Sequence, residues 1–436
     1  MLIKLFSYWL LFSLRGLPKS RAQLLRRQKR QLDKYLSRAV RQFGFYQTMT
    51  TPTLESFPII TKPTFNQHFA NLNTAGITHA EAHDFAQRAE QTGRFRQKLR
   101  GLTVGLSTGT SGNRGVFLLN GDEIARWAAM ILLRVLRLNP FRHERIAFVF
   151  RTNSNLYQAV NAGFVRMQFF PLDLDSPGAL QKLTDFAPTI LVAQPSALLR
   201  IAQRQEQNRL IIRPKRVISV AEVLDDRTRD YLTERFGTVI HQVYQCMEGF
   251  LAATCPFGTL HVNEDLLHWE KRYLDTEQKR YHPIITDFSR QTQALIHYEL
   301  NDVLIEPNAP CPCGSPLLVI GNIEGRADDV LLFRNNAGDS VAVFPDCVRR
   351  AVCDADGSIL DYAVWQNAPD SLYIYLEETH LEQPATVNAI QQNLTDLLAE
   401  RDVSGVSLTF LAYRQREPET KLRRVKRNPT ISTGIN

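Results

Sequence analysis

Short apolar runs rich in β-branched residues alternate with helical patterns through the middle of the chain. The predicted buried strands are 145–150, 189–193, 216–220 and 238–244. Residues 195–205 and 225–236 have helical spacing, and the first of these helices opens on Pro195. Alternating strands and helices favour an α/β fold with mostly parallel sheets.

The pattern changes after residues 325–329. Two further strands are predicted at 371–376 and 407–413, with a polar helix over 386–401. We therefore expect a small α+β C-terminal domain over 329–436, separate from the large α/β domain over 57–328.

Residues 1–56 form a third region, a basic amphipathic helical segment. The apolar run 5–14 is shorter than the roughly 20 residues of a spanning helix and lacks a small-residue cleavage site, so neither a membrane span nor a signal peptide is expected. The apolar positions that follow recur at helical spacing: Leu25, Leu32, Leu36, Val40 and Phe43. We expect this helix to pack on the body, with attachment to an anionic membrane surface as the alternative.

Composition fits a two-domain globular protein. The chain has 436 residues, 44% of them hydrophobic and 22% charged, with a net charge of +8. Residues 1–50 hold eleven Lys and Arg against one acid, Asp33, so the remainder is slightly acidic and no nucleic-acid partner is expected. Six cysteines in so long a chain argue against a disulfide scaffold and favour a reducing cytoplasm.

A loop rich in Gly, Ser and Thr precedes a buried helical pattern over 123–138. Glycines let backbone N–H groups converge on an anion, and hydroxyls add donors, so the loop is a candidate phosphate cradle. It is neither a Walker loop nor a Rossmann motif, and a flexible turn is the alternative. The candidate residues are Ser107, Thr108, Gly109, Thr110, Ser111 and Gly112.

Three cysteines and one histidine supply the donors of a tetrahedral zinc site. They are Cys255, His261, Cys311 and Cys313. Four protein ligands leave no open position, so such a zinc would be structural; the alternative is three buried thiols in a Pro/Gly turn. The other three cysteines are expected to be ordinary thiols.

Several segments in order resemble the adenylate-forming superfamily of acyl-CoA synthetases. The similarity is to the branch of phenylacetate-CoA ligases and coenzyme F390 synthetases, and especially to the adenylate-forming enzymes related to F390 synthetase. Besides the Ser/Thr/Gly loop, the matching segments are Ser219-Val220-Ala221-Glu222, Tyr244-Gln245-Cys246-Met247-Glu248, Ile296-His297-Tyr298-Glu299-Leu300-Asn301-Asp302 and Gly325-Arg326-Ala327-Asp328-Asp329.

The resemblance implies roles for individual residues. Ser107 to Gly112 would hold ATP phosphates, Tyr244 would lie beside adenine, Glu222 would line the nucleotide pocket and Glu248 would help to hold Mg²⁺. Asp302 would take the ribose hydroxyls and Arg326 would lie near ribose or phosphate, which suits a carboxylate and a guanidinium.

Three positions depart from the family pattern. Many relatives carry Pro-Lys-Gly after the phosphate loop, where this chain has Asn113-Arg114-Gly115, so Arg114 would supply the cation. Leu300-Asn301 replaces the usual Thr-Gly before the ribose Asp. Lys421 matches a mobile catalytic lysine near the C-terminus, although Thr420 replaces the preceding Gly; Lys426 is the substitute, and a solvated basic tail is the alternative.

By this resemblance the protein uses ATP and Mg²⁺ to activate a small carboxylic acid as an acyl-adenylate, releasing pyrophosphate. Coenzyme A is the first acceptor to consider. An amine or an internal nucleophile is the alternative, as is a catalytically degenerate binding protein. The resemblance implies a mobile C-terminal domain, and a homodimer is left open.

Overall fold

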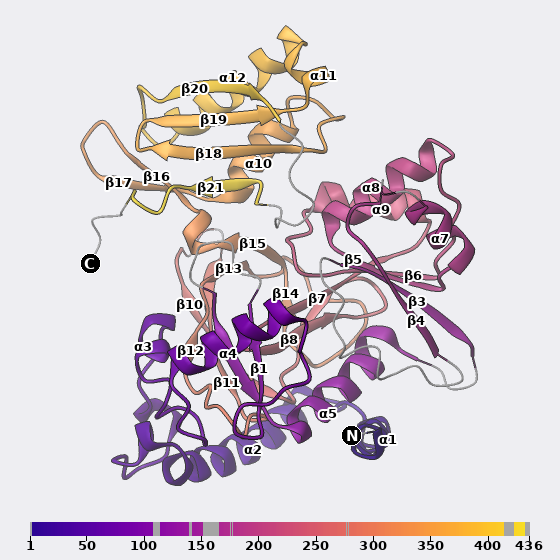
Figure 1. Cartoon of the computed structure of the whole chain (residues 1–436). Helices are drawn as coiled ribbons and strands as arrows, with labels where there is room; N and C mark the ends of the chain where they lie inside the picture. The colour runs from indigo at the N-terminus through magenta and orange to yellow at the C-terminus, as the bar shows by residue number, and fades with distance from the viewer. Residues whose placement is uncertain are drawn as a thin grey trace. The chain divides into compact units, whose positions relative to one another are not determined.

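The computed structural model describes residues 2–107, 114–138, 142–150, 165–174, 176, 178–275, 277, 279–413 and 423–431 (Figure 1). The chain divides into two compact units. The first unit contains Met1–Leu300 and Ile305–Asn322, and the second contains Asn301–Leu304 and Ile323–Asn436. Among the described residues, no helix is both long and apolar enough to cross a membrane.

An eight-stranded sheet forms the centre of the first unit and confirms the α/β prediction. Five neighbouring strands are parallel, in the order β4 (Val165–Phe170), β3 (Glu144–Val149), β5 (Ile190–Ala193), β6 (Arg216–Ser219) and β7 (Ile240–Cys246). Three antiparallel strands continue from β7: β8 (Gly249–Thr254), β9 (Leu260–Val262) and β14 (Val319–Ile320). The four strands predicted from the sequence are β3, β5, β6 and β7, each with ends shifted by at most two residues.

Local signals explain the crossover helices, which are α7 (Ala179–Phe186), α8 (Pro195–Glu206) and α9 (Asp226–Phe236). Pro195 occupies the first turn of α8, where its missing N–H is not needed. The Asp225 carboxylate caps α9 by accepting from the Thr228 backbone N–H at 2.8 Å. The chain leaves α9 through Gly237 in the left-handed conformation.

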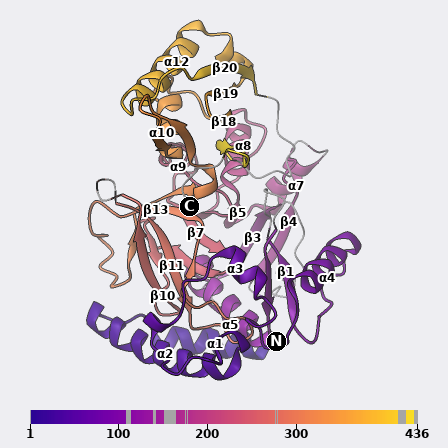
Figure 2. The same cartoon turned by 90° about the vertical axis from the view of Figure 1, so that its left-hand side faces the viewer.

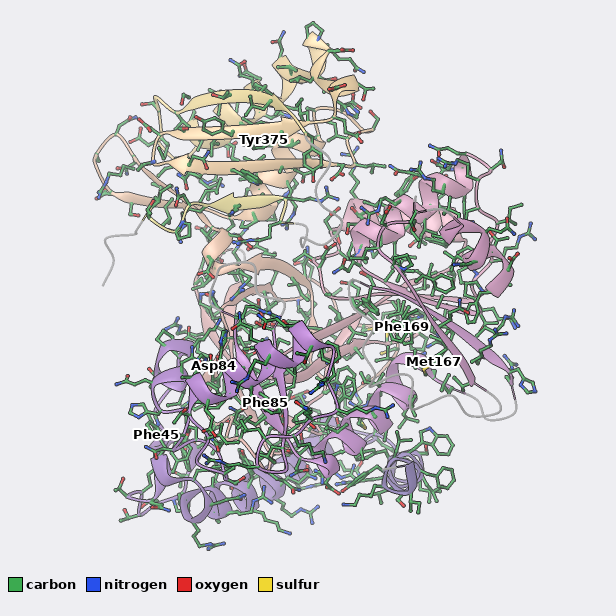
Figure 3. The ribbon with its side chains drawn as sticks, in the orientation of Figure 1. Phe45, Asp84, Phe85, Met167, Phe169 and Tyr375 are labelled. Carbon is green, nitrogen blue, oxygen red and sulfur yellow. The ribbon has the colours of Figure 1, made fainter. Side chains whose placement is uncertain are left out.

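Aromatic side chains on β3 and β4 pack within the core. The Phe148 and Phe169 rings stack with centroids 5.2 Å apart, and Figure 3 shows Phe169 and Met167 side by side on β4. Phe148 and Met167 belong to a buried cluster that also includes Ile146, Ile190 and Ile218. Phe148 and Met167 are therefore part of the core.

Smaller elements complete the first unit. They are the hairpin β1 (Thr103–Leu106) and β2 (Val116–Leu119), three strands of a five-stranded sheet, β10 (Leu267–Tyr273), β11 (Arg280–Asp287) and β12 (Tyr298–Glu299), the helices α3 (Lys62–Gln67), α4 (His79–Thr92) and α5 (Gly121–Met130), and the short turns η1 (Gly44–Tyr46) and η2 (Leu54–Ser56). The buried helix predicted over 123–138 is α5 followed by the π-helical stretch η3 (Ile131–Leu136). The boundary between the units falls within β13 (Asp302–Ile305) and β15 (Asn322–Arg326).

Two helices begin the chain, α1 (Leu2–Arg15) and α2 (Arg21–Gln42), and they lie along one edge of the first unit (Figure 2). Helix α2 packs inward through its apolar stripe, as predicted from Leu32, Leu36 and Phe43. Leu25 was predicted on that stripe and is exposed, because Leu24 takes the buried position beside it. The buried Gln28 amide also donates to the carbonyls of Glu264 and Leu267, both at 3.0 Å.

The second unit is α+β, as the sequence predicts. Its four-stranded sheet has the order β20 (Ser407–Ala412), β19 (Ser371–Leu376), β18 (Tyr362–Ala368) and β21 (Val425–Arg427). Beside it are the hairpin β16 (Leu331–Arg334) and β17 (Ser340–Val343), the helices α10 (Pro345–Cys353), α11 (Glu378–Leu381) and α12 (Pro384–Ala399), and the turn η4 (Ala327–Asp329). Val348, Val364, Ile374, Ile390 and Leu394 form the centre of its core.

One buried carboxylate joins α5 to a loop far along the sequence. Glu123 accepts from the backbone N–H groups of Gln291 at 2.7 Å and Thr292 at 3.1 Å, and from the Thr292 hydroxyl at 2.6 Å. It also closes a capping box on Asn120, whose backbone N–H lies 2.8 Å away. Four donors are therefore satisfied by one side chain.

We expect Glu123→Ala to lower the free energy of unfolding by about 3 kcal/mol, because it leaves buried donors without an acceptor. Urea denaturation followed by tryptophan fluorescence measures the change. Glu234→Ala, at an exposed position on α9, is the matched control and should shift the transition little. Equal effects of the two substitutions would contradict the role assigned to Glu123.

Candidate active site

Parallel pairing brings the carboxyl ends of β5, β6 and β7 to one edge of the main sheet. Ser196 follows β5, Glu222 follows β6 and Glu248 follows β7. The Glu222 carboxylate accepts from the Ser196 backbone N–H at 3.3 Å, at the first turn of α8. In open α/β sheets the crevice outside this edge is where ligands bind.

Glu248 lies in the turn between β7 and β8, and contacts from two directions position that turn. The hydroxyl of the buried Tyr298 donates to the Glu248 carboxylate at 3.1 Å. The Arg290 guanidinium donates to the Met247 carbonyl at 2.7 Å. Burial raises the pKa of the neighbouring Asp287 carboxyl, while Arg290 acts in the opposite direction. Glu248 is thus a half-buried acid on a well-supported turn.

The mouth of the Gly/Ser/Thr loop lies against this turn. The loop connects β1 and β2, and Ser107 closes its base: its N–H donates to the Gly115 carbonyl, and its hydroxyl accepts from the Gly115 N–H, both at 2.8 Å. A Cβ on Gly115 would lie 1.9 Å from the Met247 methyl carbon, so Met247 packs directly on that glycine. Thr108, Gly109, Thr110, Ser111 and Gly112 lie outside the described residues.

Arg114, expected to supply a cation beside the loop, is engaged in a bidentate ion pair. Its guanidinium donates to Glu90 at 2.6 and 2.7 Å and to the Ser107 carbonyl at 2.7 Å. The hydrogen bond to Glu90 raises the pKa of Arg114. In this structure Arg114 holds the loop base to α4.

Lys62 is a further cation near the loop that the motif pattern does not contain. Its Cε lies 3.8 Å from the position of a Cβ on Gly115. Helix α3 presents Lys62 there while Phe65 on the same helix packs edge-on against Tyr298, with centroids 5.4 Å apart. In the sequence, this role of Lys62 could have been suspected only from its position three residues before the aromatic Phe65.

The two remaining predicted residues of the first unit lie on β7 and after β6. Tyr244 is buried on β7, next to a register shift between Tyr244 and Gln245 that changes which way the following residues face. Ala221, directly before Glu222, has φ of 69°. A left-handed alanine is uncommon and costs conformational energy, which marks this turn as constrained.

Asp302 and Arg326 belong to the second unit. Arg326 lies 3.8 Å from Asp328, and Asp328 also accepts from the Asn301 amide at 2.8 Å. Asp329 is buried and paired with Arg423; burial raises the pKa of the Asp329 carboxyl, and Arg423 opposes that shift. The arginine and the two aspartates of the Gly-Arg-x-Asp-Asp motif thus take part in ion pairs and hydrogen bonds within the second unit.

Lys421 lies outside the described residues. Arg424, three positions further on, is buried: it donates to the Leu360 carbonyl at 2.8 Å and lies over the Tyr362 ring. Lys426 lies over the Trp365 ring at 5.3 Å. Arg424 and Lys426 therefore pack on β18 of the second unit.

The four predicted metal ligands lie together. The donor atoms of Cys255, His261, Cys311 and Cys313 are all within 4.8 Å of one another. The Cys255 and Cys311 sulfurs are 3.7 Å apart, and Cys313 Sγ is 3.3 Å from His261 Nε2. Zn–S bonds of about 2.3 Å in a tetrahedron give a sulfur–sulfur edge of about 3.8 Å. His261 Nδ1 lies 3.2 Å from the Leu317 carbonyl, which orients the ring with Nε2 toward the cluster.

Comparisons with known proteins identify the fold. Neither the protein-family models nor the curated proteins include a match to the sequence. A 2-hydroxyisobutyryl-CoA ligase in complex with 2-HIB-AMP superposes with a TM-score of 0.62 at 17% identity, covering 92% of this chain and 88% of that one. The chain has the fold of adenylate-forming ligases.

Two further structures with this fold differ in the products that their names imply. A structure from a study of fatty acyl-adenylate ligases of E. coli and L. pneumophila matches with a TM-score of 0.53 at 12% identity, over 73% of this chain and 68% of its own. The amide bond synthetase of Marinactinospora thermotolerans matches with a TM-score of 0.52 at 14% identity, over 75% and 68%. The fold therefore does not select one acceptor.

Proposed function

We propose that this protein activates a carboxylic acid with ATP, in the manner of the phenylacetate-CoA ligase and F390 synthetase branch. The substrate carboxylate attacks the α-phosphorus of ATP, the bond to the bridging oxygen breaks, and pyrophosphate leaves. The observation that carries the proposal is the packing of Met247 on Gly115, which supports the placement of Glu248 beside the mouth of the Ser/Thr/Gly loop.

The residues at the sheet edge suit this chemistry. Loop N–H and hydroxyl groups would hold phosphate oxygens, and Glu248, with Tyr298 on one oxygen, retains acceptor capacity for Mg²⁺. Mg²⁺ would neutralise charge on the phosphates. Lys62 is a second candidate cation besides Arg114, because its Cε lies 3.8 Å from the position of a Cβ on Gly115 at the mouth of the loop. In the second unit, the proposal assigns Asp302 to the ribose and Arg326 to ribose or phosphate. Lys421 is proposed as the mobile lysine.

Coenzyme A is the acceptor that we propose first, with a thioester as product. The competing acceptor is an amine or an internal nucleophile, which the amide bond synthetase among the similar structures makes a specific alternative. Omitting coenzyme A from the assay distinguishes them, because only the second route then turns over. A degenerate binding protein would consume no ATP with any acid.

We expect release of pyrophosphate from ATP that depends on both Mg²⁺ and a carboxylic acid. Glu248→Gln should lower the rate about a hundredfold, because the charge that holds Mg²⁺ is lost, and Asp302→Ala should raise KM for ATP. Tyr298→Phe should have a smaller effect, since it removes one hydrogen bond to Glu248. A coupled pyrophosphate assay over aromatic, fatty and N-acylated amino acids measures these changes.

Glu234→Gln, a charge-neutralising change on the exposed face of α9, is the control and should leave the rate unaltered. Formation of ADP and phosphate instead of pyrophosphate would refute adenylation. Full activity of both Glu248→Gln and Asp302→Ala would remove these residues from the site.

We also propose that the Cys255, His261, Cys311 and Cys313 cluster holds a structural zinc ion. The donors fit zinc in number, chemistry and spacing. The ion would join the turn after β8 and the middle of β9 to the segment before β14. A closed four-ligand site offers no position for substrate.

The purified protein should contain one equivalent of zinc by elemental analysis, and a strong chelator should lower its melting temperature by several degrees, roughly, because zinc binding contributes folding free energy. Cys313→Ser should lose the metal, whereas Cys353→Ser in α10 should retain it. A metal-free preparation that melts at the same temperature as the metal-loaded protein would rule the site out.

A further inference from the structure

Helix α1 carries an exposed apolar stripe. Ile3, Phe6, Leu10 and Leu14 recur at spacings of three and four, which places them on one side of the helix. Ile3 is 84%, Phe6 60% and Leu14 79% exposed. Of the large hydrophobic side chains exposed in the described structure, the densest group lies in residues 3–17. Such a concentration marks an interaction surface rather than scattered surface residues.

The other side of α1 is anchored to the first unit. The Tyr8 hydroxyl donates to Asp122 at 2.6 Å, and Lys4 pairs with the same carboxylate at 3.2 Å. The Arg126 guanidinium lies over the Tyr8 ring at 5.2 Å. The helix is therefore held in place with its apolar stripe facing outward, and the stripe is not a loosely packed core face.

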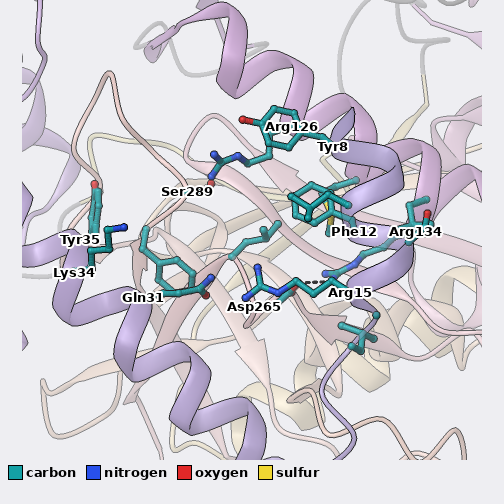
Figure 4. A pocket seen from close by; sticks show the side chains of 18 of the residues that line it. Tyr8, Phe12, Arg15, Gln31, Lys34, Tyr35, Arg126, Arg134, Asp265 and Ser289 are labelled. Atoms are coloured by element: carbon teal, nitrogen blue, oxygen red, sulfur yellow. Dashed lines mark hydrogen bonds and ion pairs between the residues drawn. The ribbon is translucent and has the colours of Figure 1, made fainter. Parts of the chain in front are cut away.

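A cavity of about 630 Å³ opens between α1, α2 and α5. Leu11 and Leu17 are exposed and also line it, so the cavity is continuous with the apolar surface of α1. Figure 4 shows Tyr8, Phe12 and Arg15 contributed by α1, and Gln31, Lys34 and Tyr35 by α2.

Cations dominate the charged lining of this cavity. The lining cations are Arg15, Lys34, Arg38, Arg41, Arg126 and Arg134, and the acid among the lining residues is Asp265. Asp265 is already paired with Arg134 at 2.6 Å. Burial lowers the pKa of Arg15, and the nearby Arg27 and Arg30 lower it further while Asp265 opposes the shift. Several positive charges therefore lie close together here, and a bound anion would reduce the repulsion between them.

We propose that α1 and the adjacent cationic face of α2 form a docking surface for an anionic phospholipid bilayer, with α1 lying in the interface and lipid phosphates at the cavity cations. A 14-residue helix is about 21 Å long, shorter than the roughly 30 Å hydrocarbon core, so it lies in the membrane plane. Exposed Leu and Phe side chains enter the acyl boundary, and the neighbouring Lys and Arg contact the headgroups.

The charge pattern disfavours the two other kinds of occupant. A second copy joined through the same face would bring two cationic faces together, and like charges repel. A nucleic acid would satisfy the cations and leave the apolar stripe of α1 in water. An anionic bilayer supplies both an apolar layer and a negative surface, and the inference does not depend on the proposed adenylation.

Flotation of the full-length protein with vesicles tests the proposal. The protein should bind vesicles of equal parts phosphatidylcholine and phosphatidylglycerol, bind phosphatidylcholine alone far more weakly, and lose most binding at about 0.5 M salt. Phe6→Glu with Leu14→Glu should reduce the partition coefficient by about a hundredfold or more, because charges would enter the acyl boundary. Ile211→Glu, at another exposed apolar position, is the matched control and should bind normally.

Lys34→Gln with Arg41→Gln should weaken binding to anionic vesicles about thirtyfold, because each cation near an anionic surface contributes about a factor of five to the affinity. Arg213→Gln with Lys215→Gln removes the same charge elsewhere on the first unit and should have little effect. Thermal melting checks that each variant folds. Failure of the wild type to bind anionic vesicles, or equal binding to neutral ones, overturns the proposal. The face would instead belong to a second copy if the wild type binds no vesicles and forms a dimer that the double substitution Phe6→Glu with Leu14→Glu dissociates.

Discussion

Parallel pairing of β3, β5, β6 and β7 is the constraint on which the candidate site depends. Neighbouring parallel strands end at the same edge, so residues more than fifty positions apart in the sequence, such as Ser196 and Glu248, come to one side of the sheet. After β7 the sheet continues with antiparallel strands, and the resulting tight turn holds Glu248. The position of the Glu248 backbone is therefore fixed by the two paired strands, β7 before it and β8 after it.

Hydrogen bonds and packing contacts from outside the main sheet then hold the turn between β7 and β8 in place. Tyr298 contacts Glu248, Arg290 contacts the Met247 carbonyl, and Met247 packs on Gly115 at the mouth of the Ser/Thr/Gly loop. Glu123 connects α5 to the loop that leads from Asp287 toward Tyr298. Such preorganisation is what phosphoryl and nucleotidyl chemistry requires, because positioning and charge stabilisation supply most of its catalysis.

The two N-terminal helices have similar amphipathic sequence patterns but turn their apolar stripes in opposite directions. Both α1 and α2 are amphipathic, but α2 turns its apolar stripe inward, where Gln28 and Arg21 bond to residues near Glu264. Helix α1 is fastened through Tyr8 and Lys4, so its apolar stripe faces outward. The cations of α2 then border an exposed apolar surface, which combines the two features of interfacial membrane binding.

Periodicity, turn residues and motif order in the sequence determined the α/β fold, the main strands and helices, and the chemical types at the site, because these depend on local backbone preference and on burial of one face. The grouping of Cys255, His261, Cys311 and Cys313 was also visible there as a donor set. Only the tertiary structure decided which partners these groups take: Arg114 is occupied by Glu90, Lys62 approaches the loop, and Leu24 rather than Leu25 is buried. Ion pairs and packing join residues distant in sequence, and a one-position shift in a helix stripe depends on the surface that the helix meets, which one sequence does not reveal.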